Sequence, residues 1–443
     1  MAGNMEDKMK KSVWTDSIEI PQFDSLNGDR KTDVLIIGGG LCGLLCAYFL
    51  QRAEIDYILV EGDRIAKGIT KNTTAKITFL HGLIYSKLIN SVGREQAQMY
   101  LSANKAALQE YEKMCGSIDC DFERKSAYTY SMKDRQKIEN EVRALHRLGI
   151  NAEFTDDLKL PFKTAGAVRV DNQAQFNPLK FIAEISKELH IYEKTFIRDI
   201  TPHTAIADNG KITADKIIVT THFPFINKHG NYYLKLYQHR SYAAAFENAQ
   251  EMEGMYVDEY NKGMSFRSYK NLLFIGGGGH RTGKKGGNWN EIYDFAKRYY
   301  PDSTEKYSWA AQDCMSLDKI PYIGLYSKRT PDLYVASGFN KWGITSSMAA
   351  AMILTDMVRG KKSEFAEVFS PQRSILKPQL AVNGFEAVMN LLTPTPKRCP
   401  HLGCALKWNR AEHTWDCPCH GSRFEESGKL IDNPSTGNAK IRK

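Results

Sequence analysis

The sequence predicts an α/β protein with three parts: a parallel-sheet region first, an antiparallel sheet in the middle and a small module with a cysteine cluster at the C-terminus. Three observations support this prediction. A short apolar strand at 33–37 runs through a glycine-rich turn into an apolar helix. Alternating stretches at 242–247 and 272–275 favour antiparallel strands. Four of the nine cysteines fall between positions 399 and 419, which is typical of a metal site.

Composition and charge exclude several classes of protein. The chain has 443 residues, 42% of them hydrophobic and 25% charged, as in ordinary globular proteins. No apolar run approaches the roughly 18–20 residues that a membrane-spanning helix needs, so we expect no integral membrane segment. The first residues lack a signal-peptide pattern, so a cytoplasmic location is expected. The net charge of +9 is scattered, which argues against a nucleic-acid partner. Nothing in the sequence indicates an oligomeric state.

The turn after the first strand carries a dinucleotide-binding pattern. Gly38, Gly40 and Gly43 form G-x-G-x-x-G between a strand and a helix. Gly38 allows the tight turn, Gly40 lets the backbone approach a pyrophosphate, and Gly43 permits close helix–strand packing. The next strand, 57–60, ends in Glu61, which is placed to accept hydrogen bonds from a ribose. The alternative is a glycine-rich turn that binds nothing. The pattern alone does not separate NAD from FAD.

The stretch that follows carries a family resemblance. Residues 72–78 read N-T-T-A-K-I-T, and 81–85 read H-G-L-I-Y. The sequence resembles the D-amino-acid-oxidase-like flavoproteins of the glycine/sarcosine oxidase type, and more narrowly the bacterial branch with a C-terminal Rieske domain. That resemblance implies a Rossmann-like FAD-binding domain, an antiparallel β-sheet substrate domain and a small all-β Rieske module. It also implies FAD contacts from Thr73, Thr74, Ala75, Lys76 and Ile197.

A second strand–turn–helix unit at 332–358 resembles the C-terminal flavin-contacting motif of the same family. The helix N-terminus would lie at the isoalloxazine, where its partial positive charge stabilises reduced flavin. The residues implied are Gly338, Trp342, Gly343, Ile344 and Thr345. By contrast, the glycine run 276–279 lacks the third motif glycine and a following apolar helix, so no second dinucleotide site is expected there.

Four polar residues are candidates for the reactive side of the flavin. His81 is the one candidate catalytic residue, for contact with substrate or flavin, and a satisfied core histidine is the alternative. His239, Arg240 and His280 are candidates for the substrate side, and structural or exposed roles are the alternative for each.

The most specific pattern lies near the C-terminus. Cys399 and His401 form one C-x-H box, and Cys417 and His420 form a C-x-x-H box. Two thiolates on one iron and two imidazoles on the other make a Rieske [2Fe-2S] centre. A structural zinc site with tetrahedral N/S ligands is the alternative. The resemblance to respiratory-type Rieske proteins further implies a disulfide between Cys404 and Cys419, and Ser422 as a hydrogen-bond donor to a bridging sulfide.

These patterns divide the chain into an N-terminal arm (1–31), an FAD-dependent oxidoreductase domain with an inserted substrate subdomain (32–370), a linker (371–393) and a shortened Rieske module (394–443). About 50 residues seldom fold without a staple, a metal or a partner surface. We therefore expect the module to rely on its cluster and disulfide, and to pack on the flavin domain or on a neighbouring subunit.

The expected function is that of an FAD-dependent oxidoreductase with a Rieske centre. It passes electrons between a small substrate, by family analogy an amine or amino acid, and the cluster, and then to an external electron carrier. The first alternative is an electron-transfer flavo-iron-sulfur protein that serves a protein partner without an organic substrate. The second is a monooxygenase-like enzyme in which the cluster feeds electrons inward.

Overall fold

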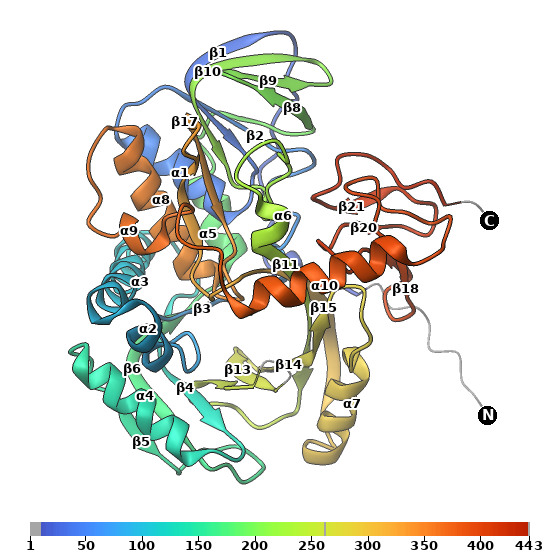
Figure 1. The fold of residues 1–443 in the computed structure, drawn as a ribbon. Helices are drawn as coiled ribbons and strands as arrows, with labels where there is room; N and C mark the ends of the chain where they lie inside the picture. The colour runs from blue at the N-terminus through green and yellow to red at the C-terminus, as the bar shows by residue number, and fades with distance from the viewer. Residues whose placement is uncertain (1–9, 261–262, 442–443) are drawn as a thin grey trace.

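The computed structural model describes residues 10–260 and 263–441 (Figure 1). It contains two large sheets and a small third one. The first sheet has eight strands. Its main path is β16 (Tyr322–Ser327), β17 (Thr330–Ser337), β10 (Gly210–Val219), β1 (Arg30–Ile37), β2 (Tyr57–Val60) and β7 (Ile191–Tyr192), with β8 (Ile197–Thr201) and β9 (Thr204–Ala207) attached to β10.

Strand β1 lies in the parallel part of this sheet and is buried on both faces. It pairs in parallel with both β10 and β2. Its side chains alternate between two hydrophobic cores: Val34 and Ile36 face one core, and Leu35 and Ile37 face the other. A strand that is covered on both faces must be apolar at every position, which explains the continuous apolar run in the sequence. Helices α1 (Leu41–Arg52) and α8 (Gly343–Val358) pack together on the first of these faces.

The second sheet has nine strands and is antiparallel except for one pair. The main path is β15 (Thr304–Ser316), β11 (Leu236–Glu247), β14 (Leu272–Arg281), β13 (Ser265–Tyr269), β12 (Met255–Asp258), β4 (Glu123–Ser131), β6 (Gly166–Gln175) and β3 (Lys76–Ile77), and β5 (Glu153–Thr155) joins β6. Strands β12 and β4 run parallel. The predicted antiparallel substrate sheet is therefore present, and the glycine run 276–279 lies within its strand β14.

The remaining helices surround the two sheets (Figure 1). They are η1 (Val13–Asp16), η2 (Thr70–Asn72), α2 (Tyr85–Val92), α3 (Arg94–Cys115), α4 (Arg135–Arg147), α5 (Pro178–Ile185), α6 (Tyr232–Lys235), α7 (Asn288–Tyr299), α9 (Ala366–Phe369) and α10 (Pro378–Leu392). Within residues 10–260 and 263–441, no helix is both long and apolar enough to cross a lipid bilayer.

Part of the segment predicted to be an N-terminal arm lies in the hydrophobic core. Trp14 is completely buried, and its ring packs edge-on against Tyr269 and Phe274. Its indole N–H donates to the carbonyl oxygen of Thr73 over 2.7 Å. The arm therefore anchors the 70–75 loop, a role that the polar composition of the surrounding sequence hides.

The C-terminal module is a four-stranded sheet with a very small core. Its strands are β18 (Lys407–Asn409), β19 (Thr414–Asp416), β20 (Arg423–Phe424) and β21 (Leu430–Asp432). The buried side chains of its core are four cysteines together with Leu406, Phe424 and Ala439. A core of this size supplies little hydrophobic stabilisation, so the module depends on covalent links and on the surface that it covers.

Gly43 is the residue in the glycine turn with the least room. A Cβ atom at this position would lie 1.9 Å from the carbonyl oxygen of Gly38 and 2.8 Å from Thr220 Oγ1. We predict that Gly43→Ala lowers the free energy of unfolding by about 3 kcal/mol, the upper range for an overpacked core. Denaturant unfolding measures this change. The control is Gly384→Ala in α10, where a Cβ meets no atom within 4 Å and unfolding should be unchanged or slightly harder; equal losses in both variants would contradict the packing argument.

Candidate functional site

A large cavity lies at the C-terminal ends of β1 and β2. Its volume is about 870 Å³, within the usual range for ligand sites. Most of the residues predicted to bind FAD line it: Gly38, Gly40, Glu61, Thr73, Thr74, Lys76, Ile197, Gly338, Trp342, Gly343 and Ile344. Gly43, Ala75 and Thr345 are outside its lining in the part of the chain that the structure describes. The turn and the two loops therefore come together as the sequence predicted.

Glu61 holds the glycine turn in shape. Its carboxylate accepts hydrogen bonds from the backbone N–H groups of Gly39 (2.7 Å) and Asp63 (2.9 Å). Burial raises the pKa of this carboxyl, although the two N–H donors favour the charged form. The remaining lone pairs of the two oxygens lie at the cavity wall, where a ribose could donate to them.

Two basic side chains, the buried Arg267 and the half-buried Lys76, lie at the 74–76 loop. The Arg267 guanidinium donates to the carbonyl oxygens of Thr74 (2.6 Å) and Ala75 (2.8 Å), and its Nε and Nη2 have no hydrogen-bond partner. Burial and, to a smaller extent, the like charge of Arg267 together lower the pKa of Lys76 to about 7. This excess of positive charge beside the cavity fits an electron-rich or anionic ligand, as a reduced flavin is.

His81 lies in the cavity wall with both ring nitrogens occupied. Its Nδ1 pairs with Tyr100 Oη at 2.7 Å, and its Nε2 lies 2.8 Å from the Thr78 carbonyl oxygen and 3.0 Å from Thr345 Oγ1. The ring stacks on Trp342 with centroids 4.8 Å apart. Burial lowers its pKa to about 3, so the imidazole is neutral. These contacts indicate that His81 positions Trp342. A role of His81 toward the substrate stays a prediction.

The three other polar candidates do not reach the flavin side. His239, Arg240 and His280 are absent from the cavity lining in the described ranges. His280 stacks on Tyr242 with centroids 5.6 Å apart, and Arg240 binds Glu412 of the C-terminal module. The structure favours the alternative of a structural role for Arg240 and His280, because the module covers this end of β11 and β14.

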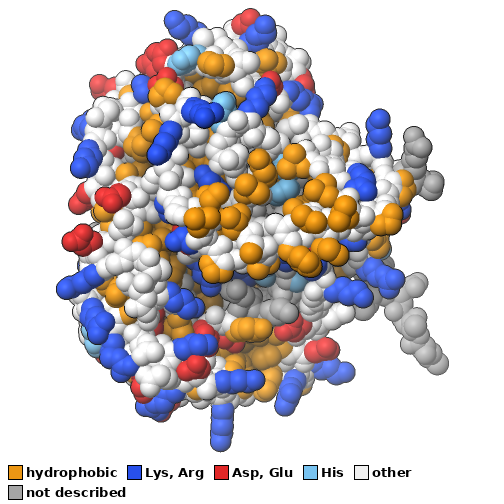
Figure 2. Space-filling model, viewed as in Figure 1, with side chains coloured by type: hydrophobic (Ala, Val, Ile, Leu, Met, Phe, Trp, Pro, Cys, Tyr) orange, Lys and Arg blue, Asp and Glu red, His pale blue; other side chains and the backbone are white. Residues whose placement is uncertain are grey.

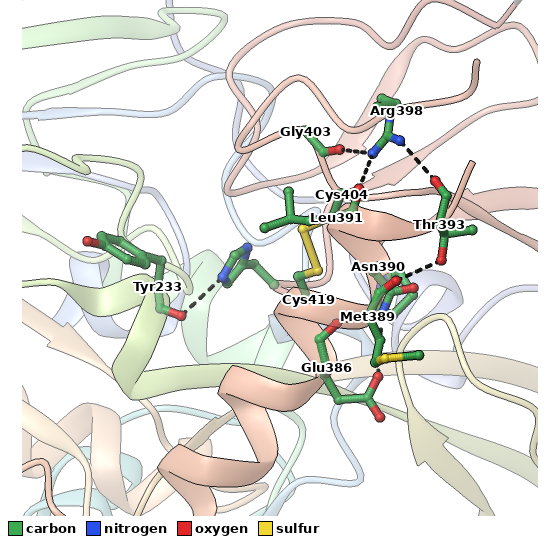
Figure 3. Close-up of a disulfide and its surroundings, with 12 residues drawn as sticks. Tyr233, Glu386, Met389, Asn390, Leu391, Thr393, Arg398, Gly403, Cys404 and Cys419 are labelled. Atoms are coloured by element: carbon green, nitrogen blue, oxygen red, sulfur yellow. Dashed lines mark hydrogen bonds between the residues drawn. A yellow bond between two sulfur atoms is a disulfide. The ribbon is translucent and has the colours of Figure 1, made fainter. Parts of the chain in front are cut away.

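The two C-terminal boxes form a pair of similar loops. Gly403 N–H donates to the Cys399 carbonyl oxygen, and Gly421 N–H donates to that of Cys417, each over 2.9 Å. Both glycines have a positive φ, 78° and 85°. The disulfide between Cys404 and Cys419 joins the loops, as the resemblance implied (Figure 3). Figure 3 also shows Arg398 tying the first loop to the end of α10 through the carbonyl oxygens of Leu391, Thr393 and Gly403.

The four predicted ligands are arranged as two pairs. The thiols of Cys399 and Cys417 hydrogen-bond to each other, and this bond, with nearby backbone N–H groups, lowers the pKa of Cys417. The rings of His401 and His420 lie 4.9 Å apart. Among the described residues, no three of these four ligand atoms lie within 4.8 Å of one another. Ligands around a single zinc ion lie closer together than this, since each is about 2.0–2.3 Å from the metal. Two separate pairs instead fit two irons.

The imidazoles are prepared to bind metal through Nδ1. His420 Nε2 lies 3.0 Å from the Tyr233 carbonyl oxygen, which can only accept, so Nε2 carries the proton. His401 Nε2 makes the corresponding contact with Asn227 Oδ1 at 2.9 Å. Both Nδ1 atoms are buried without a hydrogen-bond partner. Burial lowers the pKa of His401 to about 4 and that of His420 to about 3, so both rings are neutral, as ligation requires.

The module docks on the flavin-binding part of the same chain. Asn433 Nδ2 donates to the carbonyl oxygens of Thr221 and Phe223, and the Phe223 ring lies 6.0 Å from that of His420. Thr221 and His222 line the cavity from the other side. Residues of the module itself also contribute to the cavity wall: Asp432, Asn433, Ser435 and Thr436. The short segment 221–223 therefore separates the cavity from the two histidines.

A buried ion cluster holds this interface together. The Glu412 carboxylate of the module accepts from Arg240 of β11, from Tyr242 Oη at 2.9 Å and from Arg423 at 2.7 Å. Burial alone would raise the pKa of Glu412, but the positive charges of Arg240 and Arg423 outweigh it and lower the pKa to about 2. Sequence reasoning missed this cluster because Arg240 and Glu412 are 172 positions apart and no motif links them.

Comparison with known proteins identifies the class. Residues 33–357 match the family model of FAD dependent oxidoreductases (DAO), and residues 374–442 match that of the Rieske [2Fe-2S] domain. The chain therefore belongs to the DAO family of FAD-dependent oxidoreductases and carries a Rieske domain, with FAD and a Rieske cluster as cofactors.

One relative in sequence and two solved structures are similar to this chain. YhfW of Bacillus subtilis (strain 168), which is named as a putative Rieske 2Fe-2S iron-sulfur protein, is 32% identical over an alignment of 488 positions, gaps included, that covers 96% of each chain. The fold resembles glycine oxidase from Geobacillus kaustophilus (TM-score 0.64, 17% identity, 78% of this chain and 99% of that chain). It also resembles L-proline dehydrogenase from P. horikoshii (TM-score 0.65, 14% identity, 78% and 98%).

The ion cluster predicts a specific pH dependence. The Glu412 pKa is depressed from 4.5 to about 2 in the folded protein, so its contribution to stability is complete above pH 4.5 and is lost as the pH falls toward 2. We predict that Glu412→Gln lowers the free energy of unfolding at pH 7 by about 3 kcal/mol, because it leaves buried arginine charge uncompensated. Denaturant unfolding between pH 2 and 7 tests this.

The variant should also lose the part of the pH dependence that the wild type shows below pH 4.5. The matched control is Glu426→Gln, which changes an exposed carboxylate of the same module and should leave both quantities unchanged. A Glu412→Gln protein as stable as the wild type at pH 7 would show that the cluster does not hold the interface.

Proposed function

We propose that this protein oxidises a small amino acid or amine and passes the electrons, one at a time, through its Rieske cluster to an external carrier. One observation carries the proposal: the ligand histidines face the flavin-binding part of the same chain, across the segment 221–223. In this proposal Cys399 and Cys417 ligate one iron, and His401 and His420 the other. FAD accepts two electrons as a hydride and releases them singly, which is the chemistry that this arrangement needs.

The cavity wall favours a substrate that carries both signs of charge. Lys319 and Lys341 line it, together with Lys87 and Asp313. Burial lowers the pKa of Lys341, while the negative charge of Asp313 opposes this shift. Burial also lowers the pKa of Lys319, as do Lys87 and Lys341. Clustered ammonium groups attract a carboxylate, and Asp313 can pair with a substrate ammonium, so an amino acid fits better than a simple amine.

The proposal extends to organisation and location. In this proposal the FAD-binding residues named above contact the pyrophosphate through their backbones. Lys76 lies beside the electron-rich ring system of the flavin. The division into an arm (1–31), an oxidoreductase domain (32–370), a linker (371–393) and a Rieske module (394–443) is proposed with it, and α10 occupies most of the linker. We propose a cytoplasmic protein whose electron acceptor is a separate carrier.

Anaerobic titration of the holoprotein with amino acids and amines tests this function. We expect a substrate to bleach the flavin absorbance first and then to produce the rhombic EPR signal of a reduced Rieske cluster. Lys319→Met should raise the substrate concentration for half-bleaching about tenfold, since a hydrogen bond to a charged group contributes about 1.5 kcal/mol. Lys328→Met, on the exposed β16–β17 turn, is the control.

Two results would contradict the proposal. If dithionite reduces both cofactors but no organic compound bleaches the flavin, the protein is an electron-transfer partner without an organic substrate. If, in a separate aerobic assay, the holoprotein consumes oxygen only when electrons are supplied from outside, the direction of electron flow is reversed.

Ser422 provides a test of the cluster assignment. Its hydroxyl hydrogen-bonds to the Cys399 sulfur, while its oxygen accepts the Ser435 N–H over 3.0 Å. Hydrogen bonds to cluster sulfurs raise the reduction potential. We predict that Ser422→Ala lowers the midpoint potential by about 60 mV, the one-electron equivalent of a tenfold change in equilibrium constant. EPR-monitored redox titration measures it, with the exposed Ser427→Ala as control; an unchanged potential would place the cluster away from Ser422.

A further inference from the structure

Helix α10 is amphipathic, but its polar face packs on the protein and its apolar face is turned to the solvent. Its polar side chains face the protein: Asn383 and Asn390 are buried, and Glu386 pairs with Lys284 over 2.7 Å. Asn383 also accepts a hydrogen bond from Arg281, which holds the ligand loop through the Pro418 carbonyl oxygen. The helix is therefore fixed in place by its polar face, and its apolar face is turned outward.

The most exposed positions of α10 and of the loop after it are all apolar. Between positions 375 and 402, every exposed residue is apolar. Leu376, Phe385 and Leu392 are 83%, 65% and 74% exposed. We call this surface the α10 face; its exposed members are Leu376, Pro378, Ala381, Val382, Phe385, Val388, Met389, Leu391, Leu392, Pro394, Pro396, Pro400 and Leu402. Figure 2 shows hydrophobic side chains gathered along this helix. An apolar surface of this kind marks a binding site for a partner or a membrane.

The charges near the α10 face indicate which kind of partner binds there. From 373 to 410 the chain has six cations (Arg373, Lys377, Lys397, Arg398, Lys407 and Arg410), of which Arg373 is paired with Asp318, and one acid, Glu386, which is paired with Lys284. An isologous dimer through this face would bring the same cations of two copies together, which is unfavourable. An anionic lipid surface complements them, at about 1 kcal/mol for each basic residue near the surface.

We propose that the α10 face binds peripherally to the surface of an anionic lipid bilayer. A helix of 15 residues is about 22 Å long, too short to span the hydrocarbon core of about 30 Å. It lies in the interface, with its apolar side among the acyl chains and the rest of the molecule in water. Pro400 and Leu402 flank the ligand His401, so binding brings the cluster loop to the lipid surface.

Co-sedimentation of the full-length holoprotein with vesicles tests this proposal. The vesicles are phosphatidylcholine alone, or phosphatidylcholine with about 30% phosphatidylglycerol as the anionic lipid. We expect binding to the anionic vesicles that weakens at high salt. Phe385→Glu with Leu392→Glu should reduce binding about tenfold or more, because it places two charges in the apolar face. Both positions are exposed, so the variant should unfold like the wild type.

The matched control is Ile18→Glu with Met132→Glu, which adds the same charge at two exposed apolar positions on other elements and should bind like the wild type. Two outcomes would overturn the proposal. One is that the wild type does not bind to anionic vesicles, or that the Phe385/Leu392 variant binds to them as well as the wild type does. The other is a wild-type dimer that this variant converts to monomer, which would assign the face to a second copy. The assay needs no turnover, so its result is independent of the proposed function.

Discussion

The arrangement of this molecule depends on one interaction: the carboxylate of Glu412 forms ion pairs with both Arg240 and Arg423. The C-terminal module has too small a core to define its own position. Charge pairs buried at an interface are costly unless every group is satisfied, and here Tyr242 completes the set. Because the pairing is directional, it fixes the module on β11, and His420 and His401 then contact Tyr233 and Asn227.

That placement gives the cofactor sites a shared wall. The segment 221–223 ends the returning strand of the flavin-binding sheet, contacts Asn433 of the module and lines the cavity. Elsewhere in the site, Arg267 and Lys76 place basic groups at the 74–76 loop.

Local sequence patterns predicted much of this structure, but they did not predict its long-range contacts. Gly38, Gly40 and Glu61 lie within one strand–turn–helix–strand unit, so their spacing already defines the geometry. The cysteine and histidine boxes are similarly local. The burial of Trp14, the role of Arg240 and the outward turn of the α10 face depend on residues far away in sequence, and propensity carries no information about them. Arg240 in particular is a typical candidate for a substrate site until Glu412 is placed beside it.

The central claim is that both cofactors exchange electrons within one chain. Rapid photoreduction of the flavin in the oxidised holoprotein, followed by absorbance at the flavin and cluster bands, measures this transfer directly. The account predicts a transfer rate that is independent of protein concentration and is slowed in Glu412→Gln, where the module is less firmly docked. A rate that rises in proportion to protein concentration would show that electrons pass between molecules, and would contradict the account.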